Sequence, residues 1–168
     1  LNGMLYKVIK VLDKNGDEIS NSFGIALKKN GSFKFEDEVG GTSQLRFLAD
    51  VFGRSSADDL TYNSTLGCNE EDATADQIIQ YLADQYGLVR SDYEDINDFY
   101  RIVVIRYALS QYSYSKYITT KVAENVSDKT VAYITENSDE LTGIEIAEDT
   151  IRKYVDSEYF AHIIGYTG

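Results

Sequence analysis

Two helix-start signals follow one another in the middle of the chain. Thr74–Gln77 forms a capping box, in which the first and fourth residues satisfy each other's backbone N–H groups, and apolar residues then recur at helical spacing before Gly87. Ser91–Glu94 forms a second box ahead of a similar pattern. The apolar positions are Ile78, Leu82 and Tyr86 after the first box, and Ile96, Phe99, Val103 and Tyr107 after the second. The spacing predicts two helices joined by a short turn, a helical hairpin over about 74 to 110.

The residues before this hairpin predict a helix and a pair of strands. Leu1 to Lys14 places its apolar residues on one face of a helix, and Asn15-Gly16 supplies the C-cap. Asn30-Gly31 lies between two strand-like runs, which is a strong short-range signal for a β-hairpin. We therefore expect a β-hairpin at about 22 to 37.

Shorter elements are expected on both sides of the helical pair. Ser43 can cap a short helix that Gly53 stops, and the polar, aperiodic residues 54 to 72 predict a loop. Residues 117 to 125 have the β-branched content of a strand. Ser127 can cap a following helix.

The order of the elements predicts the fold class. Residues 143 to 154 alternate isoleucine with charge and predict a further strand. Helices and strands are segregated along the chain, which predicts an α+β fold with antiparallel strands. A length of 168 residues fits one domain, so we expect a single domain over 1–168 with the helical hairpin as an insertion. Leu1 is not an initiator methionine, and we expect the chain to be a portion of a longer protein.

The charge balance excludes several kinds of partner. Twenty-eight acidic side chains against sixteen basic ones give a net charge of −12, which repels phosphate backbones and anionic lipid surfaces. No apolar run approaches the roughly 18–20 residues that span a bilayer. We expect no nucleic-acid partner and no membrane-spanning segment within this sequence.

Few residues could support catalysis or bind a metal. Cys68 is the only cysteine, which rules out an intrachain disulfide, and no base partner for it is evident. His162 is the only histidine, and its apolar neighbours favour a structural hydrogen bond over general-base catalysis. Two acidic groups lack the ligand spacing of a calcium loop and are expected to be solvated surface: Asp13 with Asp17, and Glu70, Glu71, Asp72 and Asp76. We expect no cofactor and no metal.

Ser113 and Lys116 reproduce the Ser-x-x-Lys spacing of penicillin-recognising acyltransferases, in which the lysine lies one helical turn from the nucleophilic serine. Here the tetrad lies between a helix end and a strand, and an extended chain puts the two side chains on opposite faces. The supporting motifs are incomplete as well, since residues 127–129 read Ser-Asp-Lys and 129–131 lack the glycine of Lys-Thr-Gly. We interpret the tetrad as non-catalytic. A serine acyltransferase using Ser113 and Lys116 is the weaker alternative, and a free-standing acidic protein-interaction domain is another.

The C-terminal residues contain an ordered series of motifs. A helix ending at Glu136 leads to the strand-like Gly143–Ile146, then to Arg152 with Tyr154, and then to Ala161–Tyr166, which reads Ala-His-Ile-Ile-Gly-Tyr. The series resembles the N-terminal, non-catalytic region of class B penicillin-binding proteins, the membrane-anchored transpeptidases that cross-link peptidoglycan. Thr142 and Val155 depart from it, because proline is common there in the family. The resemblance implies structural roles for Glu136, Gly143, Arg152, Tyr154, His162, Gly165 and Tyr166.

The resemblance also implies a location and a role. In that family the region is a pedestal, often called the dimerisation domain, on the extracellular face of the bacterial membrane. It holds a C-terminal transpeptidase domain away from an N-terminal membrane anchor, and it contributes no catalytic residue. Implied partners are the chain's own transpeptidase domain and either a second copy or other proteins of cell-wall synthesis. The helical hairpin is similar to an insertion in members from Gram-positive anaerobes, and fourteen tyrosines suit partner contacts.

Overall fold

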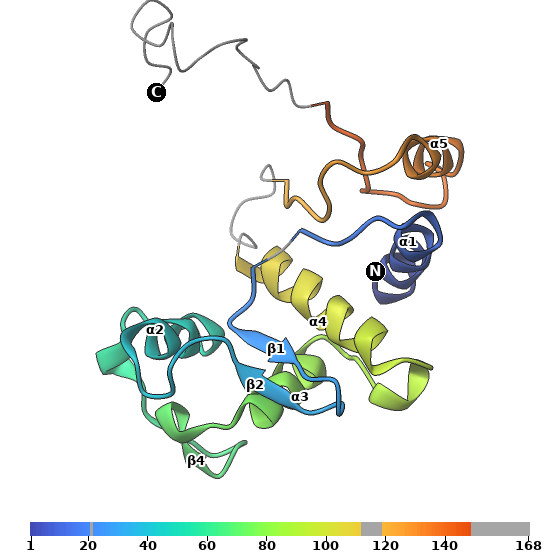
Figure 1. Cartoon of the computed structure of the whole chain (residues 1–168). Coiled ribbons are helices and arrows are strands. Elements are labelled where there is room, and N and C mark those ends of the chain that lie inside the picture. Colours follow the sequence, from blue (N-terminus) through green and yellow to red (C-terminus); the bar gives the residue numbers. More distant parts are fainter. Residues whose placement is uncertain (21, 112–118, 149–168) are drawn as a thin grey trace, which may run out of the picture.

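The computed structural model describes residues 1–20, 22–111 and 119–148. Helix α1 (Asn2–Asn15) packs against the long helix α4 (Ile96–Gln111), and helix α5 (Asp128–Glu136) lies on the other side of α1 (Figure 1). Gly16 ends α1 at φ 77°, in the left-handed region that glycine adopts without a steric cost, as the C-cap prediction required.

The predicted helical hairpin is confirmed. Of the two predicted capping boxes, the one at Thr74 is found and the one at Ser91 is not. Helix α3 (Ala75–Gln85) begins at the predicted capping box, where the Thr74 hydroxyl accepts from the Gln77 N–H at 3.3 Å and the Gln77 amide accepts from the Thr74 N–H at 2.9 Å. The second box was wrong, because Arg90–Asp92 forms a short 3-10 helix, η3, and α4 starts later. Asp95 accepts from the N–H of Asn97 at 2.8 Å and so satisfies a free N–H at the start of α4.

The β-hairpin is also confirmed. Strands β1 (Ile25–Leu27) and β2 (Phe33–Phe35) pair antiparallel, with Ile25 opposite Phe35. The connecting loop closes with a hydrogen bond from Gly31 N–H to Lys28 carbonyl at 2.9 Å, and Gly31 has φ 82°. This is a three-residue loop with a glycine bulge, so only the glycine of the Asn-Gly pair adopts a positive φ.

Helix α2 (Thr42–Val51) begins earlier than expected, so the assignment of Ser43 as its cap was wrong. The N-cap is Gly41, in extended conformation, and no side chain caps the helix there. The buried Gln44 amide oxygen instead accepts from the Gly40 N–H at 2.5 Å, which holds the chain as it enters the helix.

Residues 54 to 72 are more ordered than a loop. They contain two 3-10 helices and a second antiparallel strand pair: η1 (Ala57–Asp59), β3 (Tyr62–Asn63), β4 (Cys68–Asn69) and η2 (Glu70–Asp72). Glu70 organises this segment, and its carboxylate is fully buried. Arg54 donates to it at 2.9 and 2.7 Å, and the Thr61 N–H donates at 3.1 Å. The prediction of solvated surface was therefore wrong for Glu70, whereas its acidic neighbours Glu71, Asp72 and Asp76 are exposed.

The main core lies between α1, α2, α3, α4 and the β1–β2 hairpin, and α1 contributes Leu5 and Ile9 to it. Its fully buried side chains include Ile25, Leu48, Ile78, Ile79, Leu82, Ile102 and Ile105. Within the described ranges the chain has five α-helices and two small antiparallel hairpins, which confirms the α+β class. Among those same residues, no helix is both long and apolar enough to cross a bilayer.

Two predicted strands are not found in the residues that the structure describes. Ala123 forms a single antiparallel bridge to Ile19, and Ser20 N–H donates to the Val122 carbonyl at 2.8 Å, so residues 119–125 approach the chain after α1 without forming a strand. Residues 143–148 form no strand either, because no partner strand lies beside them in the described ranges. The remaining residues of both predicted strands lie outside the described residues.

Candidate functional site

A small apolar cluster packs the last described part of the chain onto α1. Val8 and Leu12 of α1 contact Ile134 of α5 and Leu141, which follows α5. Leu141 is 2% exposed, and this cluster is separate from the main core. The position of α5 therefore depends on its contacts with α1 and with the residues flanking it.

A polar clasp, formed by Asp17, Ser127, Thr130 and Asn15, ties the start of α5 to the end of α1. The Asp17 carboxylate accepts from the Ser127 N–H and hydroxyl, each at 2.9 Å, and from the Thr130 hydroxyl at 2.5 Å. Asn15 donates to the Thr130 hydroxyl at 2.8 Å. The Thr130 hydrogen bond, more than any other contact, lowers the pKa of Asp17 below its ordinary value. Ser127 is the N-cap residue, as predicted, but its hydroxyl binds Asp17 rather than capping α5.

A charged network joins the other side of α1 to α4. Arg101 donates to both carboxylate oxygens of Asp13, at 2.7 and 2.5 Å, and to Asp98 at 3.1 Å. Lys10 donates to Asp98 at 2.5 Å, and Asp98 is 2% exposed. Hydrogen bonding from Arg101 lowers the pKa of Asp13, and hydrogen bonding to Asp98 raises the pKa of Lys10. Charged residues therefore join α1 to α4, and the polar clasp joins the end of α1 to α5.

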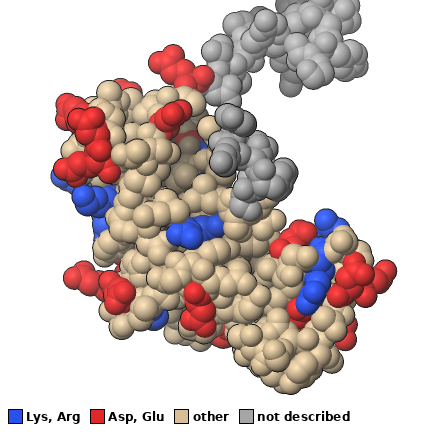
Figure 2. Space-filling model, turned by 180° about the vertical axis from the view of Figure 1, so that it is seen from behind, with Lys and Arg blue, Asp and Glu red and all other residues tan. Residues whose placement is uncertain are grey.

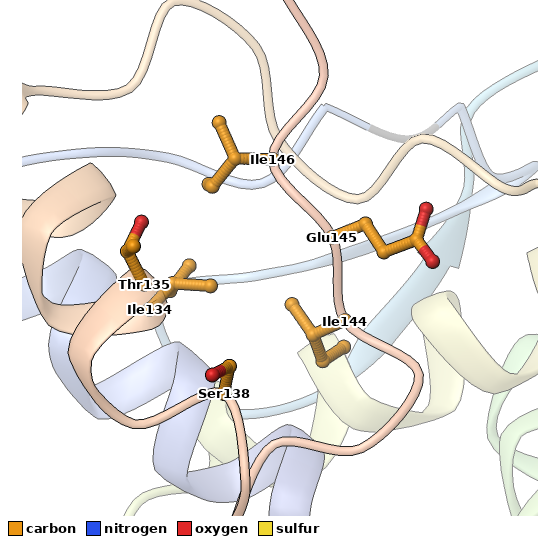
Figure 3. A pocket seen from close by; sticks show the side chains of 6 residues that line it. All are labelled: Ile134, Thr135, Ser138, Ile144, Glu145 and Ile146. Carbon is orange, nitrogen blue, oxygen red and sulfur yellow. The ribbon is translucent and has the colours of Figure 1, made fainter.

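A groove of about 360 Å³ opens between α5 and the segment that follows it. Ile134, Thr135 and Ser138 come from α5 and its C-terminal turn, and Ile144–Ile146 form the opposite wall (Figure 3). Figure 3 shows Glu145 pointing away from α5, whereas Ile144 and Ile146 lie on the side of the helix. The groove is lined by aliphatic side chains, the hydroxyl groups of Thr135 and Ser138, and one carboxylate, that of Glu145.

Comparison with known protein families identifies the family of the chain. A family model described as the penicillin-binding protein dimerisation domain matches residues 4–168. The chain belongs to this family. The match includes most of α1, as well as α2, the β1–β2 hairpin and the C-terminal motif series. No curated protein matches the chain.

The motif residues of this penicillin-binding protein dimerisation domain are only partly described. Glu136 is the last residue of α5 and is exposed. Gly143 has φ 90° and turns the chain between Leu141 and the groove wall, a conformation that a residue with a side chain would strain to adopt. The other motif residues, Arg152, Tyr154, His162, Gly165 and Tyr166, lie outside the described residues, as do Ser113 and Lys116.

The other candidate residues of the domain have structural partners. Asp13 is exposed, as expected, although Arg101 binds its carboxylate. Asp17 was also expected to be solvated surface, and this was wrong, because it is half-buried and held by the polar clasp. Cys68 lies half-buried in β4 at the edge of the main core. Within the described ranges, no group of three or more His, Cys, Asp or Glu side chains could hold a metal ion.

Sequence reasoning missed Asp98 and Arg101, which join α4 to α1. The available signal was two opposite charges three residues apart inside an otherwise apolar helical run. The tyrosines were expected to suit partner contacts, but among the residues that the structure describes most of them pack in or against the main core, as Tyr107 does at 8% exposure. Among the large apolar side chains that stand exposed, the tyrosines are Tyr62 and Tyr133.

Proposed function

We propose that the chain is the non-catalytic pedestal of a membrane-anchored peptidoglycan D,D-transpeptidase, spanning residues 1–168 as one domain. Its role is to position the C-terminal transpeptidase domain and to contact other proteins of cell-wall synthesis. The observation that supports this most directly is the family match over residues 4–168. The match ties the chain to penicillin-binding proteins, whose substrate is the bacterial cell wall.

The geometry of α1 suits a pedestal. A domain that holds another domain in position needs helices whose relative positions are fixed. Arg101 and Asp98 lock α4 to α1, and Asp17 locks the start of α5 to the end of α1. Side chains fixed by several hydrogen bonds of this kind resist rotation more than an apolar contact alone does.

The motif residues are assigned structural roles under this proposal. Gly143 makes the turn after α5, and Glu136 ends that helix. Arg152, Tyr154, His162, Gly165 and Tyr166 take the family's structural positions in the segment leading toward the transpeptidase domain. None of them acts on substrate, and the chain requires no cofactor or metal.

The proposed location is the extracellular face of a bacterial membrane, with attachment through an N-terminal anchor of the parent protein. The partners are the parent's own transpeptidase domain and either a second copy of this domain or another protein of cell-wall synthesis. Net charge of −12 argues against nucleic acid as a partner. Acidic side chains are spread over the face of the molecule in Figure 2, and that face has no extended basic patch. Likeness of the α3–α4 hairpin to an insertion in clostridial members supports a Gram-positive source.

The test is to label the full-length product of the encoding gene with fluorescent penicillin and to locate the adduct by mass spectrometry. The 168-residue chain is labelled in parallel, with Ser113→Ala as its control. We expect the adduct on a serine outside these residues and no labelling of the chain alone.

Two outcomes would contradict the proposal. An adduct on Ser113 that the alanine variant abolishes would make the chain an acyltransferase. A gene encoding neither an anchor nor a Ser-x-x-Lys domain would leave a free-standing acidic interaction domain.

A further inference from the structure

A second concavity, of about 740 Å³, lies on a different part of the domain from the α5 groove. Its walls come from the residues entering β1, the end of β2, and the facing sides of α2 and α4. Neither the polar clasp nor the charged network on α1 contributes to it. We refer to it as the aromatic cleft, because four aromatic side chains line it: Phe23, Phe47, Tyr100 and Tyr107.

The rings of the aromatic cleft hold one another in place. The ring centroid of Phe23 lies 5.3 Å from the ring centroid of Phe47 and 5.2 Å from that of Tyr107. The ring centroids of Phe47 and Tyr107 lie 5.7 Å apart. The Tyr100 hydroxyl donates to the Ile25 carbonyl at 2.6 Å, which fixes its ring against β1. The site is therefore organised before any ligand arrives, which lowers the entropy cost of binding.

The charges of the aromatic cleft are mostly negative. Glu36 and Asp37 are exposed after β2, and Asp50 is on α2. Arg46 is the only basic side chain among the lining residues, and it lies 3.4 Å from Asp50, which leaves Glu36 and Asp37 as the unbalanced pair. Burial, with a smaller contribution from Glu36, raises the pKa of Tyr100 to about 12, so its phenol stays neutral near pH 7.

Aromatic faces beside carboxylates attract an organic cation carried on an apolar stem. The ring quadrupole attracts the cation, the stem covers the rings, and the carboxylates accept its N–H groups. A small inorganic cation holds its hydration water tightly and has no apolar stem to cover the rings, so it gains less from them, and an anion is repelled by Glu36 and Asp37. A volume of about 740 Å³ also accommodates backbone on either side of such a side chain.

We propose that the aromatic cleft is a docking site for an arginine- or lysine-bearing segment of a partner protein. The cationic head lies at Glu36 and Asp37, and its stem lies over Phe23 and Phe47. The charge of the cleft selects the partner, because a neutral or acidic segment lacks the attraction to the two carboxylates. This assignment goes beyond the pedestal role and does not depend on the parent's transpeptidase activity.

The test uses the isotope-labelled 168-residue chain, titrated with a capped Gly-Gly-Arg-Gly-Gly peptide and followed by NMR chemical shifts. The matched probe replaces arginine with citrulline, which keeps the shape and removes the charge. We expect shifts confined to residues around Phe23, Glu36 and Phe47. We also expect the arginine peptide to bind at least about fivefold more tightly than the citrulline peptide at low salt, with a smaller ratio at high salt.

Variants separate the cleft from general charge attraction. Glu36→Gln combined with Asp37→Asn should weaken arginine-peptide binding about fivefold or more. The matched control, Glu71→Gln combined with Asp72→Asn, removes the same charge from two exposed positions of η2 and should leave binding unchanged. Phe47→Leu should also weaken binding, with folding checked by circular dichroism.

Several results would overturn the assignment. These are equal binding of the citrulline peptide, equal loss in the control variant, and shifts spread over the acidic surface. Methylguanidinium binding as tightly as the arginine peptide would identify a site for a small organic cation and exclude a partner segment.

Discussion

Arg101 on α4 donates hydrogen bonds to both carboxylate oxygens of Asp13 on α1, at 2.7 and 2.5 Å, and the two residues are 88 positions apart in the chain. The same guanidinium contacts Asp98, one turn earlier on α4. A planar guanidinium can serve two carboxylates at once, which a lysine ammonium does with less geometric control. Arg101 therefore helps to set the orientation of α1 on α4, together with Lys10 and the apolar contacts of Leu5 and Ile9.

Replacing Arg101 by methionine is expected to lower the free energy of unfolding by about 2–3 kcal/mol. Asp98 is buried and would keep only Lys10, which limits the loss below that of a fully orphaned charge. Urea unfolding followed by circular dichroism measures the change. The control is Lys7→Met, which breaks the exposed pair with Glu140 and should cost less than about 1 kcal/mol. Equal effects of the two substitutions would contradict the role given to Arg101.

Local signals in the sequence predicted turns and helix ends well where a single residue type determines the backbone conformation. Gly16 and Gly31 have positive φ angles, and Thr74 makes its capping box, because these features depend on residues a few positions apart. The second capping box failed because other local structure forms in its place. The chain at Arg90–Asp92 makes a 3-10 helix and Asp95 takes the role of the cap.

Long-range partners could not be predicted. Glu70 looked like part of an acidic surface run, and its burial depends on Arg54, sixteen residues earlier. Asp17 looked like a solvated loop residue, and its partners Ser127 and Thr130 are more than a hundred residues away. A carboxylate's environment is decided by the residues that the fold brings to it, and a single sequence contains no record of those pairings.

Asp17→Asn is expected to loosen α5 without unfolding the rest of the domain. The amide keeps the size of the side chain but loses the charge that strengthens hydrogen bonds from Ser127 and Thr130. Hydrogen exchange should accelerate for amides of α5 and stay unchanged for those of α3. The matched control is Glu18→Gln, the same change at the exposed neighbouring position. Acceleration throughout the chain in Asp17→Asn, or the same acceleration in the control, would contradict the polar clasp.

The stabilisation by Asp17 should depend on pH in a defined direction. Its folded pKa lies below the ordinary value of 3.8, so the contribution is fully present above about pH 4–5 and is lost as the pH falls through the folded pKa. Acid also relieves repulsion among the many carboxylates, which complicates the curve of either protein alone. The useful quantity is the difference in unfolding free energy between the wild type and Asp17→Asn. We expect it to be constant from about pH 5 to 7 and to shrink below about pH 4. A difference that grows in acid would contradict the assignment.

Gly24→Ala tests the packing under the aromatic cleft. A Cβ at Gly24 would lie 2.7 Å from Cγ of Phe47, so the ring must move away from its contact with Phe23. Overpacking of this kind costs about 1–3 kcal/mol. Gly3→Ala is the control, because nothing lies within 4 Å of the new methyl group and α1 should gain up to about 1 kcal/mol in helix propensity. Phe47→Leu should partly rescue Gly24→Ala, since the smaller side chain removes the clash. Additive losses in the double variant would show that the ring does not press on Gly24.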